Sequence, residues 1–260
     1  VFPGLTAPKL IWLANYEPKL FSKIAKVLLP KDYLNFWLTG EYTSDMSDSS
    51  GTSWLDTKRR LWSNYLLNSS GMRLDQMPNL YESSKPIGNL RDSIAKEWGV
   101  SKKIIVVSGA GDNAAAACGI GVINEGDTFI SIGTSGVLLT AKENFSPKPA
   151  NALHTFCHAI HNRWYQMGVM LSATDSLNWL ANIQGKKVVD LTNSLGKKIT
   201  GPNTTQFLPY LSGERTPHND SNIRASFVNL DLSSNLNDLT QSILEGVAFA
   251  FRDNFEVLKN

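Results

Sequence analysis

A single aspartate, Asp112, stands where the sequence predicts that a strand ends and a helix begins. Residues 104–107 are Ile-Ile-Val-Val, a run typical of a strand buried on both faces, and residues 109–114 are Gly-Ala-Gly-Asp-Asn-Ala. Open α/β sheets bind ligands at the rim where such strands end. Because Asp112 is the only acidic residue between Glu97 and Glu125, we expect apolar surroundings that raise its pKa toward the range of a general base.

Two other interpretations of these residues stay open. Asp and Asn are favoured at helix N-caps, so capping alone would explain Asp112. Gly109, Gly111 and Ala114 also satisfy the permissive dinucleotide-binding pattern G-x-G-x-x-A. That fold places an acidic residue at the end of the next strand, whereas Glu125 precedes the next strand here, and that strand enters a hairpin. The pattern by itself does not establish a nicotinamide site.

A second candidate is the turn at residues 133–136, Gly-Thr-Ser-Gly, between the predicted strands 128–132 and 137–140. Two glycines and two hydroxyls at such a turn can direct backbone N–H and side-chain O–H groups at phosphate oxygens. Gly and Ser are also common in ordinary hairpin turns for conformational reasons. The sequence therefore predicts either a phosphate-binding turn or a plain hairpin at this position.

Three histidines, His154, His158 and His161, lie close to Cys157. On a helix, the first two and Cys157 could share a face and hold zinc. The surrounding Thr, Phe, Trp and Tyr residues favour strands, on which Cys157 faces away from both histidines. We therefore expect no metal site in this segment. Cys118 and Cys157 each lie in an apolar stretch and are expected to be free, buried thiols.

Composition sets the class of protein. The 260 residues include 25 Lys and Arg against 23 Asp and Glu, a formal net charge of +2, which argues against a nucleic-acid partner. With 42% hydrophobic and 18% charged residues, the chain has ample apolar surface to fold. It contains neither an apolar run of about 18 residues nor a secretion signal, so we expect a cytoplasmic protein without a membrane partner.

The chain ends predict a piece of a longer protein, because the sequence starts at Val1 without Met and its last helical pattern runs to Asn260.

Apolar periodicity predicts the elements that must position these candidates, with a domain boundary near Gly126. Helices are expected within the first forty residues, broken at Pro18 and Pro30, and at residues 62–68, 92–98, 114–118, 172–183 and from 236 onward. Strands are expected at residues 104–107, in the hairpins 128–140 and 153–170, and near 227. The second hairpin should turn near His161 and Asn162.

Seven segments, in the same order along the chain, resemble the FGGY carbohydrate kinases, and within this family the kinases that act on D-xylulose. They are residues 5–12, 28–34, 44–56, 109–114, 131–136, 154–158 and 213–220. The resemblance implies an α/β fold of the actin-like ATPase (ribonuclease H-like) type, with two domains hinged around a cleft. It also implies that residues 1–125 are the C-terminal part of the sugar-binding domain and residues 126–260 the N-terminal part of the nucleotide-binding domain.

The resemblance assigns chemistry to the candidates at the end of the first domain. Asp112 matches the family's catalytic aspartate, which takes the proton from O5 of D-xylulose as this oxygen attacks the γ-phosphorus of ATP. Asn113 beside it would form a hydrogen bond with the sugar. The resemblance favours structural roles for the histidines.

The resemblance also implies a nucleotide site in the second domain. Gly133, Thr134 and Ser135 match a phosphate-binding turn of the family, at which Mg²⁺ offsets the charge of the phosphates. Thr174 and Asn178 fall near positions that line the nucleotide cleft in relatives. The implied ligands are therefore a sugar, ATP and Mg²⁺.

The chain departs from the family pattern in a few places. Asn229 stands where a glycine is usual, and Tyr16 where another polar residue is usual. The family's opening Asp-x-Gly-Thr phosphate turn and its later adenosine turn have no counterpart in the chain, which implies the central part of a kinase. Ribulose, glycerol and gluconate stay open as substrates, a non-catalytic actin-like module as a function, and a homodimer as the assembly.

Overall fold

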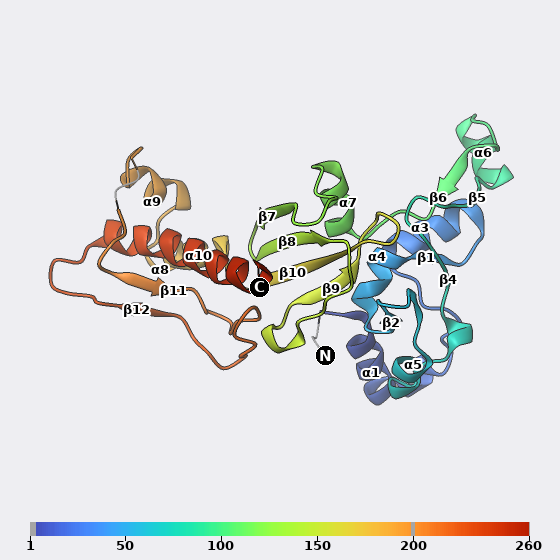
Figure 1. The fold of residues 1–260 in the computed structure, drawn as a ribbon, viewed down its shortest axis with the longest axis horizontal. Coiled ribbons are helices and arrows are strands. Elements are labelled where there is room, and N and C mark those ends of the chain that lie inside the picture. Colours follow the sequence, from blue (N-terminus) through green and yellow to red (C-terminus); the bar gives the residue numbers. More distant parts are fainter. Residues whose placement is uncertain (1–3, 199–200, 260) are drawn as a thin grey trace. The chain divides into compact units, whose positions relative to one another are not determined.

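The computed structural model describes residues 4–198 and 201–259, and these divide into two compact units (Figure 1). The first unit comprises Val1–Asp127, Ala141–Phe145 and Thr155–Tyr165, and the second comprises Thr128–Thr140, Ser146–His154 and Gln166–Asn260. Val1 and Asn260, on which the expectation about the chain ends rests, lie outside the described residues. None of the described helices is both long and apolar enough to cross a membrane.

Prolines and glycines of the sequence set several helix boundaries in the first unit. α1 (Thr6–Tyr16), α2 (Pro18–Phe21) and α3 (Pro30–Thr39) confirm the predicted breaks, because α2 and α3 each begin at a proline. α5 (Asn64–Ser69) and α6 (Asp92–Trp98) follow the predictions for those segments closely. α6 ends at Gly99, whose φ of +66° is the left-handed conformation that glycine adopts without strain.

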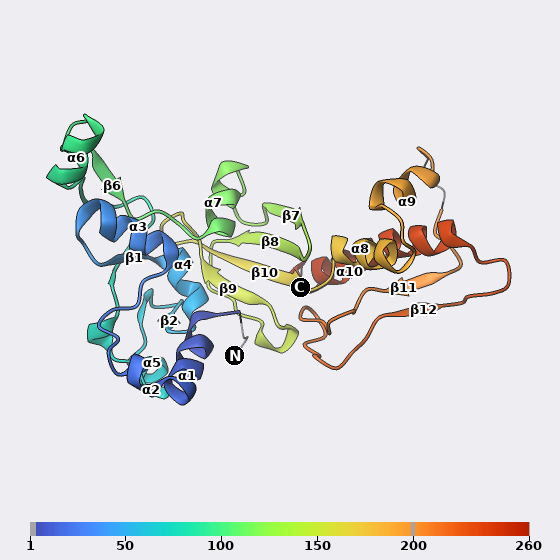
Figure 2. The same ribbon diagram turned by 180° about the vertical axis from the view of Figure 1, so that it is seen from behind.

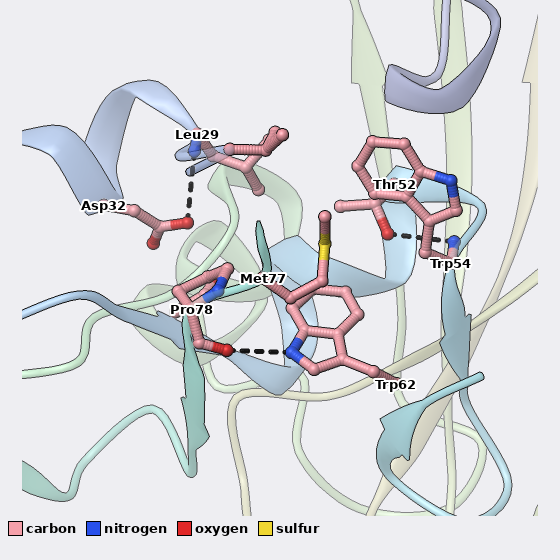
Figure 3. A pocket seen from close by; sticks show the side chains of 9 residues that line it. Leu29, Asp32, Thr52, Trp54, Trp62, Met77 and Pro78 are labelled. Atoms are coloured by element: carbon pink, nitrogen blue, oxygen red, sulfur yellow. Dashed lines mark hydrogen bonds between the residues drawn. The ribbon is translucent and has the colours of Figure 1, made fainter. Parts of the chain in front are cut away.

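In the core of the first unit, side chains of α1, α2 and α5 pack against Trp54 and Trp62. Five buried residues form one cluster: Ala7, Trp54, Leu67, Met72 and Met77. α1, α2 and α5, which contribute to it, lie together in Figure 2. Trp54 and Trp62 also line a cavity of about 10 Å³, which has room for one water molecule at most (Figure 3). There the Trp62 indole N–H donates to the carbonyl of Pro78 at 2.8 Å, so the core is closed by packing and hydrogen bonding together.

A polar segment follows α3 and is folded tightly. β1 (Thr43–Asp45) pairs in parallel with β4 (Asn79–Tyr81), and the last residue of β1 caps the short helix α4 (Met46–Ser49). Two 3₁₀ turns, η1 (Ser50–Thr52) and η2 (Leu74–Gln76), and the paired strands β2 (Leu55–Asp56) and β3 (Leu61–Trp62) complete this part.

The strand expected to be buried is exposed. β6 (Ile105–Val107) pairs only with β5 (Pro86–Asn89), in antiparallel orientation, and Ile105 and Val107 keep 60% and 46% of their surface accessible. The prediction is wrong because burial on both faces requires covering layers, and no element within residues 4–198 and 201–259 covers these two side chains.

The helix predicted after β6 is present as α7 (Asp112–Gly119). However, β6 does not pair with the next strand along the chain. A dinucleotide-binding fold needs parallel strands joined across such a helix, so the described elements contradict that alternative.

Both predicted hairpins lie in one four-stranded sheet of order β7-β8-β10-β9. β7 (Thr128–Ile132) and β8 (Gly136–Lys142) are antiparallel, with Ile132 opposite Gly136, so residues 133–135 form the turn between them. η3 (Pro149–Asn151) precedes β9 (His154–Cys157), and β10 (Trp164–Met170) lies beside β9. The connection contains Asn162 with a φ of +54°, a left-handed conformation that Asn tolerates, which confirms the predicted turn.

The second unit is completed by its longest helix, α10 (Leu236–Lys259), which lies along β11 (Gln206–Leu208) and β12 (Ser226–Val228) in Figure 1. α8 (Thr174–Ile183) and α9 (Val188–Ser194) pack with it around a shared core. The buried residues of this core are Leu177, Leu180, Ala181, Leu191, Phe207 and Ile243. Gly246 permits the close approach of α10 to β11, because a Cβ at this position would collide with the carbonyl of Phe207.

Two asparagines explain local features of this unit. Asn235 accepts the N–H of Asn237 at 2.9 Å through its side chain, so α10 begins where the sequence predicts. Asn229, which stands where the family usually has glycine, has a φ of +60°. Asn is among the few residues other than glycine that adopt this left-handed conformation readily, so the departure preserves the backbone shape.

Candidate active site

Asp112 is exposed at the first position of α7, directly after a turn of small residues. Gly109 in that turn has a φ of +80°, and its N–H donates to the carbonyl of Ser83 at 2.9 Å. Oδ1 of Asp112 accepts the N–H of Asn113 at 2.7 Å and its side-chain amide at 3.2 Å, whereas Oδ2 accepts no hydrogen bond from the described residues. Gly111 is the N-cap residue of α7, so an N-cap role does not account for Asp112.

The surroundings of Asp112 are acidic rather than apolar. α4 packs so closely against the turn that a Cβ on Gly111 would lie 3.2 Å from Cα of Asp48. Burial raises the pKa of Asp48 from 3.8 to about 6; the charge of Lys31 opposes this shift, and neighbouring carboxylates, Asp45 and Asp112 among them, add to it. The expectation that Asp112 stands alone in an apolar site is therefore wrong, because α4 brings acids from elsewhere in the sequence against its turn.

Sequence reasoning missed this acidic segment. Residues 44–49 are Ser-Asp-Met-Ser-Asp-Ser, a composition typical of an exposed turn, yet Ser44, Asp45, Ser47 and Ser49 are buried. The one signal available in the sequence is the density of hydroxyl and carboxyl groups in a segment that also resembles the family. Their burial depends on partners far along the chain.

The turn at residues 133–135 is exposed, and α8 and the residue before it hold its carbonyl groups. Gly133 O accepts the N–H of Thr174 at 3.0 Å and its hydroxyl at 2.8 Å. Thr134 O accepts the N–H of Ala173 at 2.8 Å. The structure thus brings Thr174 onto the same turn as Gly133 and Thr134, three residues that the resemblance assigns to the nucleotide.

Donor groups on the turn remain available to a ligand. The Ser135 hydroxyl donates to Leu171 O at 3.1 Å, and Gly133 N–H donates to Ser135 O at 2.9 Å, so these groups stabilise the turn itself. In the part of the chain that the structure describes, the N–H groups of Thr134 and Ser135 and the hydroxyl of Thr134 have no hydrogen-bond partner. Successive free donors at an exposed turn are suited to an anion such as phosphate.

Thr174 and Asn178 line a cavity of about 440 Å³ in the second unit. Ile132, Leu177 and Phe251 contribute to its apolar wall. This volume lies within the range of small-molecule sites, and a few polar groups in an apolar wall are typical of such sites. The cavity therefore has the size and chemistry to accept an organic ligand such as a nucleoside.

Each of the three histidines has its own surroundings. Burial, with a contribution from the charge of Arg215, lowers the pKa of His154 to about 4. His158 Nε2 lies 3.0 Å from the carbonyl of Val122, and His161 lies 3.3 Å from a carboxylate oxygen of Glu82. Among the described residues, no three His, Cys, Asp or Glu side chains are arranged to hold a metal ion. Both cysteines are free thiols; one is buried, while Cys118 is partly exposed, contrary to the prediction for it.

Two sequence profiles cover nearly the whole chain. Residues 1–119 match the N-terminal domain, and residues 128–260 the C-terminal domain, of the FGGY family of carbohydrate kinases. The chain belongs to this family. Within it, the xylulose kinase of Escherichia coli (strain K12) is 45% identical over 259 residues, which are 99% of this chain and 53% of that protein.

Solved structures agree with this assignment. The crystal structure of a xyloylose kinase from Brucella ovis has 54% identity and a TM-score of 0.97, covering 100% of this chain and 54% of that one. A gluconate kinase from Lactobacillus acidophilus has 26% identity and a TM-score of 0.87, covering 96% of this chain and 51% of that one. The chain thus has the FGGY kinase fold and spans about half the length of the relatives it matches.

Proposed function

We propose that the chain is the central part of an ATP-dependent kinase that converts D-xylulose to D-xylulose 5-phosphate. The observation that carries the proposal is the 45% identity, over 99% of the chain, to a xylulose kinase. Because the chain spans about half of that relative, the protein that performs the reaction would be about twice as long, and we refer to it as the full-length kinase.

In this proposal Asp112 is the general base. Its exposed Oδ2, which no described residue engages, takes the proton of the O5 hydroxyl while O5 forms a bond to the γ-phosphorus. The bond between that phosphorus and the bridging oxygen breaks, and ADP leaves. Asn113, at the next position of α7, forms a hydrogen bond with a sugar hydroxyl.

The second part of the proposal concerns the nucleotide. The free N–H groups of Thr134 and Ser135 and the Thr134 hydroxyl donate to phosphate oxygens, and Gly133 leaves the approach open because a Cβ there would meet only Ser135 O, at 3.7 Å. Thr174 and Asn178 contact the nucleoside in their cavity.

Mg²⁺ would reach the second unit together with the nucleotide. This ion usually keeps several waters and binds substrate phosphates, and the exposed Thr134 hydroxyl, which has no hydrogen-bond partner among the described residues, is an oxygen donor beside the proposed phosphate site. When bound, Mg²⁺ offsets the negative charge of the phosphates.

The proposal extends to organisation. Residues 1–125 would belong to the sugar-binding domain and residues 126–260 to the nucleotide-binding domain. We place the full-length kinase in the cytoplasm, where its proposed ligands ATP and free sugar are found. Light scattering of the purified protein tests the homodimer that the sequence leaves open.

A substrate panel tests the function. The full-length kinase should release ADP with D-xylulose at a higher kcat/KM than with D-ribulose, glycerol or gluconate. Preference for another of these compounds would leave a carbohydrate kinase with a different substrate, an outcome that the likeness to a gluconate kinase makes worth including. Absence of sugar-dependent ADP release with all four would favour a non-catalytic module instead.

A further inference from the structure

The turn that carries Asp112 is anchored by a buried ionic network in the first unit. Asp45 is fully buried, and its Oδ1 lies 3.0 Å from the ammonium group of Lys31. Its Oδ2 accepts the N–H of Ser47 at 2.8 Å, the Ser47 hydroxyl, and the Ser83 hydroxyl at 3.0 Å. A buried carboxylate with an ion-pair partner and several hydrogen bonds is held in one orientation.

Ser47 connects this fixed carboxylate to the turn. While its hydroxyl donates to Asp45, its Oγ accepts the N–H of Gly111 at 3.0 Å. The α4 backbone at Asp48 fills the space in which a side chain on Gly111 would lie. Since Gly111 is the N-cap of α7, the Ser47 hydroxyl fixes the residue immediately before Asp112.

Lys31 anchors the opposite end of the same turn. Its ammonium group donates to the carbonyl of Ser108 at 3.2 Å, and Asn35 donates to the same carbonyl at 2.8 Å. A Cβ on Gly109 would lie 3.0 Å from Cδ of Lys31, so the aliphatic part of this side chain packs against the turn. The ion pair of Lys31 with Asp45 therefore links the two ends of residues 108–111, and Lys31 is also held by Asp32, whose Oδ1 lies 2.6 Å from its ammonium group.

We propose that the Lys31–Asp45–Ser47 network positions the carboxylate of Asp112 for proton transfer, without contacting substrate itself. This inference rests on the proposed function, in which Asp112 is the base. A general base acts only within hydrogen-bond reach of the proton it takes, and a misplacement of about 1 Å costs about 100-fold in rate. Ser47 is the point at which to test the network because, among the described residues, its hydroxyl is the hydrogen-bonding group that joins the ion pair to Gly111.

In the full-length kinase, Ser47→Ala should lower kcat about 10- to 100-fold, while the KM for ATP stays within about threefold of the wild-type value. Ser47→Thr keeps the hydroxyl and should restore kcat to within about threefold of wild type. Ser49→Ala is the matched control, because Ser49 is buried in the same helix and its hydroxyl pairs with that of Ser44 at 2.9 Å rather than with Asp45 or Gly111. It should lower the melting temperature by a similar amount and leave kcat unchanged.

A Ser47→Ala enzyme with kcat within about threefold of wild type overturns the proposal, as does an equal loss of kcat in Ser49→Ala. If Asp112→Asn loses turnover and Ser47→Ala does not, the positioning role is rejected, while the proposed function of Asp112 as the base still stands. Full activity of Asp112→Asn rejects the proposed function and this inference with it.

If Ser47→Ala does not fold, hydrogen exchange of backbone amides in the wild-type protein tests whether Ser47 holds the turn. The Gly111 N–H, held by Ser47, should exchange at least about tenfold more slowly than the Ala110 N–H, which has no partner among the described residues. Equal rates for these two amides overturn the inference.

Discussion

Replacing the half-buried acid next to the turn, Asp48→Asn, should stabilise the protein at neutral pH but not at acid pH. Asp48 has a pKa raised from 3.8 to about 6, chiefly by burial, so folding disfavours its ionised form. At 1.36 kcal/mol per tenfold change, this shift corresponds to about 3 kcal/mol. Partial solvent exposure of the carboxylate reduces the expected effect to about 1–2 kcal/mol.

The sign of this effect follows from the protonation states. Above pH 6 Asp48 is ionised in the folded and the unfolded chain, and the folded state carries the whole penalty. Between pH 6 and about 4 the folded chain takes up a proton first, so the penalty shrinks, and below 3.8 both states are protonated and it is gone. Asn carries no charge at any of these pH values, so the stabilisation by Asp48→Asn should be present at pH 7.5 and largely lost at pH 4.

Urea unfolding of the 260-residue chain at a series of pH values measures this difference. Asp190→Asn is the matched control, because Asp190 also occupies the third position of a short helix but is exposed. Its substitution should change the free energy of unfolding by less than about 0.5 kcal/mol at every pH. A stabilisation by Asp48→Asn that does not depend on pH, or a destabilisation at pH 7.5, would refute the reasoning.

Three further predictions follow from the packing and the turn. Gly246→Ala should destabilise the chain by about 1–3 kcal/mol, because the new Cβ would collide with the Phe207 carbonyl. Gly119→Ala, which is also in a helix but has open space around it, should not destabilise the chain. Thermal unfolding of the two variants tests this difference. In the full-length kinase, Thr134→Ala should raise the KM for ATP several-fold and leave the affinity for sugar intact. Calorimetry that shows sugar affinity lost and ATP affinity retained would mean that the assignments of the sugar site and the nucleotide site are reversed. Because the 260-residue chain spans about half of its relatives, it should not phosphorylate D-xylulose alone, and turnover near about 1–100 per second in a coupled assay would contradict this.

Local features of the fold could be predicted from the sequence because their causes are local. Pro18 and Pro30 cannot continue a helix, and Gly99 allows the left-handed end of α6, so these boundaries follow from residue type alone. The turn at residues 133–135 follows equally from glycines between two apolar strands. Such features need no knowledge of what lies elsewhere in the chain.

Long-range features could not be predicted. The apolar run at β6 has the composition of a buried strand, but its burial depends on neighbouring layers, and the described chain leaves Ile105 exposed. Residues 44–49 have the composition of a surface turn, but Asp45 and Ser47 are buried, and a hydrogen bond from the Gly111 N–H to Ser47 joins this segment to a position more than sixty residues away. The hydrogen bond from Lys31 to Ser108 joins positions separated by 77 residues. The sequence therefore predicted Asp112 as a candidate site residue, but it did not predict the buried residues that hold the turn before it.

The central claim, that Asp112 is the base of a sugar kinase, is tested most directly by kcat of Asp112→Asn in the full-length kinase. The substitution keeps the size of the side chain and an oxygen that can accept the Asn113 N–H, but removes the proton acceptor. Asp92→Asn is the matched control, since Asp92 occupies the same first position of α6. The account predicts that Asp112→Asn lowers kcat about 100- to 10,000-fold with D-xylulose binding and melting temperature retained, while Asp92→Asn changes none of these. An Asp112→Asn enzyme that melts with the wild type and turns over within a few-fold of it would contradict the account.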